Sequence, residues 1–413
     1  MMRPRRGAAS SGSGRDGSRG AEGLAAGMGR GVMDSGARQY FDTVIAAASL
    51  GFVSLGDSLI YVVLPLYPAA FGIETASVAI LLSVNRVIRI IGYGWVSPLS
   101  RRFGANTLTA AACAAAALST LAYGLVSGFA LLFLARLTWG ATYGVINLTN
   151  TAYAYGDGQR AGMRIGLNRA VSMLGPVLAL GLGGWLVTQV GPRYVFVIYG
   201  IAGFIAVPLA LRLPRLRQAV GDAAPVPHRR WRASPLNVLF FVVALGADGV
   251  FTATLSTLLA DIIPVASALI GAGLLLAGQR LISVVLAFAS GPIVDRFEAR
   301  RMLAPCSLVI AAGMIAIAAG HVYTGAVVLM IARAMFAIIG PIVAAQQSTD
   351  RIGAIAAYST WSDCGLAVGA FLGIVGVQWA GFPLTYVTLA ATTLVALGWF
   401  MLRVPSAPPP KRA

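Results

Sequence analysis

Apolar stretches of about 20 residues, the length at which an α-helix crosses the hydrocarbon core of a bilayer, recur along the whole sequence. Only α-helices and closed β-barrels satisfy every backbone hydrogen bond in lipid, and continuous apolar runs lack the alternation of barrel strands. The sequence therefore predicts an all-α membrane protein with twelve transmembrane helices at residues 43–67, 76–97, 105–126, 129–152, 165–189, 193–212, 237–260, 265–290, 302–320, 323–345, 355–379 and 383–402.

The composition agrees with a membrane protein and excludes other classes. Of the 413 residues 58% are hydrophobic and only 11% are charged, whereas soluble proteins carry about 25% charged residues. The chain is therefore not expected to be an enzyme. Its three cysteines and two histidines lack metal-ligand spacing, and its single lysine, Lys411, leaves no phosphate-binding Gly-Lys loop. We expect no metal and no cofactor, with a transmembrane proton gradient as the energy source.

Basic residues lie in alternate loops and explain the net charge of +17 without a nucleic-acid partner. By the positive-inside rule these loops face the cytoplasm. We expect a monomer embedded in the lipid bilayer as a multi-pass protein of a bacterial inner membrane, with both termini cytoplasmic. The expected order is a disordered cytoplasmic segment (1–40), a six-helix half (41–212), a cytoplasmic linker (213–236), a second six-helix half (237–403) and a cytoplasmic tail (404–413).

The two halves share residues at a nearly constant offset. Segments 97–104 and 291–298 are alike at an offset of 194, and three further matches lie close to that offset: Asn85-Arg86 with Gln279-Arg280, Asp57 with Asp248, and Arg136 with Arg333. Two homologous six-helix halves are the parallel-repeat organisation of a secondary transporter.

The segment Gly291-Pro292-Ile293-Val294-Asp295-Arg296-Phe297 resembles the signature that the major facilitator superfamily carries between helices 8 and 9. Residues 97–104 resemble its counterpart between helices 2 and 3, although Arg101 stands where the family usually has Asp. Gly175-Pro176 resembles a fifth-helix motif common among antiporters of that family. The resemblance covers residues 40–404. It implies two pseudo-symmetric six-helix bundles with a cytoplasmic gate formed by Arg101, Arg102, Gly291, Asp295 and Arg296.

Nine charged residues lie inside the predicted spans, at a cost of about 2.5–3.5 kcal/mol each near a helix centre. Six arginines and three aspartates leave a surplus of +3, and guanidinium groups suit carboxylate or phosphate, which favours an anionic or zwitterionic organic substrate. The alternative is that several arginines pair with Asp, cap helix ends or, for Arg169, extend to the interface. The nine are Asp57, Arg86, Arg89, Arg136, Arg169, Asp248, Arg280, Arg333 and Asp363.

The substrate is expected to contact polar residues of the central cavity: Asp57, Tyr61, Asn85, Arg86, Arg136, Tyr143, Asp248, Gln279, Arg280 and Arg333. Asp57 and Asp248 are candidate proton carriers, because a carboxylate that moves between wet and dry surroundings loads and releases a proton. Asp363 is also assigned to proton coupling. It is expected to pair with Arg86 or Arg89 across the halves, either as a structural contact or as part of a switch.

The predicted function is alternating-access secondary active transport, with proton-coupled export of a small anionic or zwitterionic molecule such as a siderophore, drug or metabolite. Competition between substrate and aspartate for one arginine is a mechanism for such antiport. The Gly175-Pro176 resemblance favours export. One alternative is a proton-coupled importer, a symporter of an organic anion. Another is a receptor or scaffold without transport, which would gain nothing from intramembrane charge.

Overall fold

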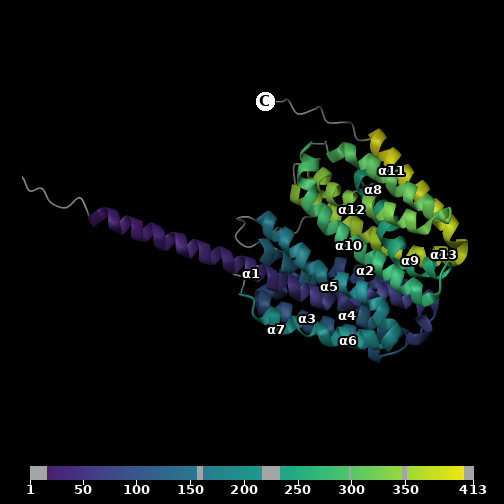
Figure 1. Ribbon diagram of the computed structural model, residues 1–413, viewed down its shortest axis with the longest axis horizontal. Coiled ribbons are helices and arrows are strands. Elements are labelled where there is room, and N and C mark those ends of the chain that lie inside the picture. The colour runs from purple at the N-terminus through teal and green to yellow at the C-terminus, as the bar shows by residue number, and fades with distance from the viewer. Residues whose placement is uncertain (1–15, 156–160, 216–232, 297–298, 347–350, 404–413) are drawn as a thin grey trace, which may run out of the picture.

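A computed structural model describes residues 16–155, 161–215, 233–296, 299–346 and 351–403, and every element within these ranges is helical. Figure 1 shows the two halves as two bundles that lie side by side, the first in purple to teal and the second in green to yellow. The first half contains α1 (Asp16–Leu66), η1 (Pro68–Phe71), α2 (Thr75–Phe103), α3 (Ala105–Leu125), α4 (Phe129–Tyr155), α5 (Ala161–Val190), α6 (Tyr194–Gly203) and α7 (Ala206–Leu211). The second half contains α8 (Pro235–Ala244), η3 (Leu245–Val250), α9 (Phe251–Ala260), α10 (Val265–Arg296), α11 (Ala299–Ala318), α12 (Val322–Gln346) and α13 (Arg351–Arg403).

Ten helices among the described residues are long and apolar enough to cross a membrane. α13 contains the last two predicted spans, and its backbone leaves the helical conformation at Gly381 (φ 71°, ψ 170°), just before Pro383. α2 contains the predicted span 76–97 and is 29 residues long, but it is not among the ten. The all-helical class is confirmed, and the count of twelve spans stays a prediction.

The N-terminal segment differs from the expectation. α1 begins at Asp16 and continues without a break into the first apolar span, and its start projects beyond the bundle (Figure 1). The structure gives residues 16–40 as part of this helix, where the sequence predicts a disordered segment. Extending a helix that is already formed avoids the cost of nucleation, and this extension forms although residues 16–40 contain more glycine than alanine. Residues 1–15, most of the linker (216–232) and the tail (404–413) lie outside the described residues.

Glycines let helices within each half approach closely. A Cβ atom on Gly175 of α5 would collide with the backbone of Gly51 in α1, and one on Gly369 of α13 would collide with the carbonyl of Leu245 in η3. Small residues at such crossings allow the van der Waals contact that holds membrane helices together. Equivalent helices are thus packed in the same way in both halves, as the repeat predicts.

The two halves meet where α5 packs against α10 and α2 packs against α13. A Cβ atom on Gly273 of α10 would collide with the carbonyl of Leu180 in α5, and one on Gly184 would lie 2.8 Å from the Cα of Ile270. Gly184 and Ile270 lie near the ends of their helices that face the loops at 191–193 and 261–264. The described contacts therefore join the halves on the side that the charge pattern predicts to face away from the cytoplasm.

Candidate functional site

A cavity of ≈ 230 Å³ lies between the two halves and is lined by α1, α2 and α5 of the first and by η3, α9, α10, α12 and α13 of the second. Its wall contains more arginine than aspartate and has a surplus of +2. Such a surplus inside a membrane favours an anion. The charged lining residues are Asp57, Arg86, Arg169, Asp248, Arg280 and Arg333.

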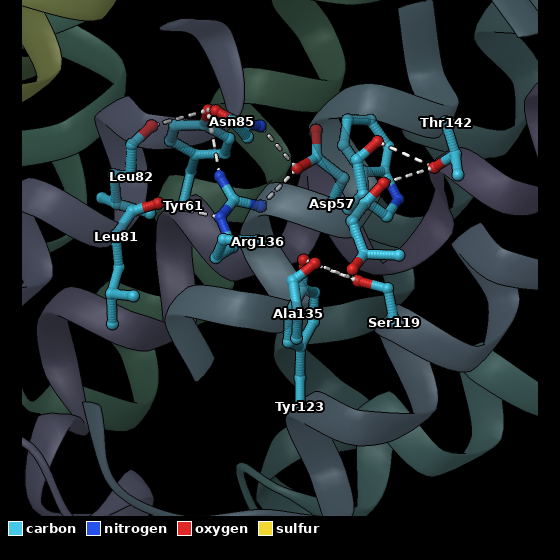
Figure 2. A network of polar contacts seen from close by, with 12 residues as sticks. Asp57, Tyr61, Leu81, Leu82, Asn85, Ser119, Tyr123, Ala135, Arg136 and Thr142 are labelled. Carbon is cyan, nitrogen blue, oxygen red and sulfur yellow. Dashed lines mark hydrogen bonds and ion pairs between the residues drawn. The ribbon is translucent and has the colours of Figure 1, made fainter. Parts of the chain in front are cut away.

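The first half holds a closed ion pair beside this cavity. Arg136 of α4 donates from Nη1 to Oδ1 of Asp57 at 2.5 Å and from Nε to the carbonyl of Leu81 at 2.9 Å (Figure 2). Its side chain is 1% exposed and that of Asp57 is 12% exposed. A buried guanidinium needs this density of acceptors, because unpaired charge is costly in a low dielectric.

Two neutral side chains, those of Asn85 and Tyr61, add hydrogen bonds around the ion pair of the first half. Asn85 of α2 donates from Nδ2 to Asp57 at 3.2 Å, and the hydroxyl of Tyr61 donates to the Asn85 side chain and to the carbonyl of Leu82. Arg136 also lies over the Tyr61 ring, with its Cζ 5.4 Å from the ring centroid. The network of Asp57, Tyr61, Asn85 and Arg136, drawn in Figure 2, joins α1, α2 and α4.

The second half holds the matching pair, and it is more open. Arg333 of α12 donates from Nε to Oδ2 of Asp248 at 2.7 Å, and its Nη2 lies 2.5 Å from the same oxygen. Both residues line the cavity, with side chains 12% and 17% exposed, and the buried Nη1 of Arg333 has no hydrogen-bond partner among the described residues. Asp248 lies in η3, a π-helical turn of the kind frequent at functional sites.

A third ion pair joins the halves. Nη1 of Arg86 in α2 lies 3.9 Å from Oδ1 of Asp363 in α13, with side chains 16% and 25% exposed. The predicted partnership of Asp363 with an arginine of the second helix is confirmed for Arg86. Arg89 instead lies over the ring of Tyr143, with its Cζ 3.8 Å from the ring centroid.

Two arginines face the cavity outside these pairs. Arg280 of α10 lines it next to the buried Gln279, and its buried Nε has no hydrogen-bond partner among the described residues. Arg169 of α5 is exposed and also lines the cavity. Arg169 is not among the substrate contacts expected from the sequence, because its place near a helix end suggests the interface. The signal that could have identified Arg169 as a cavity residue is its charge within a predicted span.

The structure places the other expected substrate contacts behind the cavity wall. Asn85 and Arg136 support Asp57, and Tyr143 packs under Arg89 and stacks on Trp139. They are not among the lining residues, whereas Ser58, Thr252 and Ser283, which sequence reasoning missed, are. A hydroxyl in an apolar helix is too common a feature to single out from sequence.

The expected gate lies at the ends of α2 and α10. Arg101 and Arg102 are exposed in the last turn of α2. Gly291, Asp295 and Arg296 belong to the end of α10, and their side chains lie outside the described part of the structure. The gating assignment stays a prediction.

Comparisons with known proteins agree with this architecture. The sequence profile described as Major Facilitator Superfamily matches residues 46–263 and 238–413. A mutant of the nucleoside transporter NupG superposes with a TM-score of 0.69 at 14% identity, covering 88% of this chain and 99% of that chain. A bacterial homologue of the human lysosomal transporter Spinster, in an inward-facing and occupied conformation, gives 0.67 at 15% identity, covering 88% and 96%. These likenesses concern the fold, and no curated protein matches the sequence.

Proposed function

Because the chain belongs to the major facilitator superfamily and is a transporter, we propose that it moves a small organic anion together with a proton. The observation that carries the proposal is the cavity between the halves, whose wall has a surplus of +2 and contains the Asp248–Arg333 pair. An anion is drawn to such a wall and binds guanidinium through charge-assisted hydrogen bonds.

Proton and anion strengthen one another's binding at this pair. A proton on Asp248 removes the negative charge 2.5 Å from Arg333 and frees its guanidinium for the substrate. Coupling between two binding events is reciprocal, so a bound anion raises the affinity of Asp248 for the proton by the same factor. Ligands that bind together cross together. An inward proton gradient then drives import by symport, the alternative given above. Competition of an anion with Asp248 for Arg333 therefore favours symport, and not the antiport expected from the sequence.

Asp248 fits the role of proton carrier better than Asp57 does. Asp248 and its partner Arg333 both line the cavity. Asp57 is instead bound by Arg136, which is buried, and by Asn85. A carrier must exchange its proton with the cavity, and the pair of Asp248 is the one whose two members both line it.

Proton-coupled export is the second candidate, and the two aspartates in the cavity wall favour it for one substrate type. The ammonium group of a zwitterion competes with the proton for a carboxylate, so that substrate and proton exclude one another and cross in opposite directions. The Gly175-Pro176 motif adds little to this case, because the contact of Gly175 with Gly51 already requires a glycine there.

The direction of transport is tested by comparing small molecules in cells and medium for the native strain and a strain that lacks the gene. Under import, deletion leaves an organic anion in the medium and depletes it inside the cell. An anion or zwitterion that instead accumulates inside on deletion would contradict import and make export the function.

Coupling is tested with the identified compound in proteoliposomes. Asp248→Asn is expected to abolish uptake driven by a pH gradient while exchange of internal for external substrate continues. Asp57→Asn provides the comparison, since its effect is expected to follow protein stability. Equal gradient-driven uptake by Asp248→Asn and the native protein would contradict Asp248 as the carrier.

A further inference from the structure

The charges of the cavity do not cancel. Three aspartates lie in the predicted spans, and each has an arginine within 4 Å, in the pairs Asp57–Arg136, Asp248–Arg333 and Asp363–Arg86. Arg169 and Arg280 also line the cavity, and the described residues place no carboxylate within that distance of either. The surplus of +2 therefore belongs to these two residues.

The surroundings of Arg280 are suited to an anion. Its Nε is buried and has no hydrogen-bond partner among the described residues. Its charged neighbours are Asp248, Arg169 and Arg86, and of these Asp248 is already bound by Arg333 and Arg86 already lies beside Asp363. Like charges repel strongly away from bulk water, and buried guanidinium N–H groups are normally paired. A ligand with acceptor oxygens satisfies both requirements.

We propose that the substrate is a small organic dianion whose charged groups bind Arg169 and Arg280. The proposal rests on the transport function given above. A cavity that closes to water with a charge of +2 is unfavourable, and a substrate of charge −2 restores neutrality. Arg169 comes from α5 of the first half and Arg280 from α10 of the second. The bound dianion thus joins the two halves, and the cavity closes only around it.

Matched ligand pairs test the charge of the substrate. Thermal unfolding of the purified full chain in detergent is measured at pH 8 and constant ionic strength, with phenyl phosphate against phenyl sulfate and succinate against succinamate. Phosphate esters carry about two negative charges at this pH because their second pKa is about 6. We expect the dianion of at least one pair to stabilise the protein at a concentration at least about 10-fold lower than its monoanion. The two pairs distinguish phosphate esters from dicarboxylates.

Variants test the two arginines. Arg169→Gln and Arg280→Gln are each expected to weaken the stabilisation by the dianion about 10- to 150-fold, the range for a hydrogen bond to a charged group. Arg169→Lys and Arg280→Lys keep the charge and should lose less. Arg193→Gln is the control, because Arg193 lies outside the cavity and donates to the carbonyls of Gly124 and Val126.

The results separate this proposal from the transport proposal. If no dianion of the panel stabilises the protein more than its monoanion, or if Arg169→Gln and Arg280→Gln bind the dianion as tightly as the control, the inference is wrong. Proton-driven uptake of a monoanion by both variants also overturns it and leaves the proposed function intact. Loss of dianion binding in both variants, with no proton movement in the native protein, supports the inference and contradicts the coupling.

Discussion

Removing one aspartate from each half is expected to have unequal effects on stability, although Asp57 and Asp248 are equivalent in the repeat. Asp57→Asn leaves the charge of Arg136 without a counterion at a side chain that is 1% exposed. Breaking a buried pair in this way costs about 3–5 kcal/mol. Arg333 is 12% exposed and lines the cavity, so Asp248→Asn should cost closer to the ~1 kcal/mol of a solvated pair.

The assay is thermal unfolding of the purified protein in detergent, followed by intrinsic fluorescence. One kcal/mol shifts the unfolding temperature of a domain the size of one half by about 2–4 °C. Asp57→Asn should therefore lower it by roughly 6–20 °C and Asp248→Asn by about 2–4 °C. Adding Arg136→Gln to Asp57→Asn removes the orphaned charge and should restore part of the loss, which a double-mutant cycle measures.

Equal shifts for Asp57→Asn and Asp248→Asn would refute the reasoning, because burial would then not distinguish the two pairs. Failure of Arg136→Gln to recover any stability in the double variant would also contradict it. The loss would in that case come from the carboxylate itself, through its contact with Asn85, and not from the uncompensated guanidinium.

Three further predictions concern other parts of the site. Arg86→Asp and Asp363→Arg should each slow transport at least about 10-fold by placing like charges together, and the double exchange should recover part of the rate in proteoliposomes; no recovery would contradict a pair across the halves. Thr252→Tyr should fill the cavity wall at the position that repeats Tyr61 and weaken substrate binding, measured as a raised KM; an unchanged KM would exclude Thr252 from the binding surface. Gly175→Leu should lower the unfolding temperature by more than about 5 °C, since the contact with α1 leaves no room for a side chain.

Much of this arrangement follows from the sequence because charge is rare in a membrane. An ionisable residue in an apolar span is costly, so each one marks a helix that faces protein or water. This reasoning places Asp57, Arg86, Asp248, Arg280 and Arg333 together, and the structure brings all five to one cavity. The repeat offset also matches Asp57 with Asp248 and Arg136 with Arg333, and the structure shows that each aspartate of this set is paired with the arginine of its own half.

The presence of a polar residue in a span does not tell whether its side chain lines the cavity or lies behind the cavity wall. Asn85 of α2 and Arg136 and Tyr143 of α4 are polar residues inside predicted spans, yet none of them lines the cavity. Periodicity gives the direction of a side chain around a helix, and the rotamer and the neighbouring helix decide whether it reaches the cavity. Arg169 shows the opposite case, since a residue near a helix end extends inward instead of to the interface.

The neighbouring residues explain why the Asp57–Arg136 pair is more buried than the Asp248–Arg333 pair. Tyr61 lies four residues after Asp57, and its ring covers Arg136 while its hydroxyl donates to Asn85. Thr252 lies four residues after Asp248, and its short side chain lines the cavity instead of covering Arg333. The Cζ of Arg136 lies 5.4 Å from the ring centroid of Tyr61 and 5.9 Å from that of Tyr123. Arg333 has the Phe336 ring at 6.0 Å, and with Thr252 in place of a tyrosine the second pair stays more open to the cavity. Two halves with the same charged residues can thus divide the work, with the first pair holding the bundle together and the second exchanging the proton.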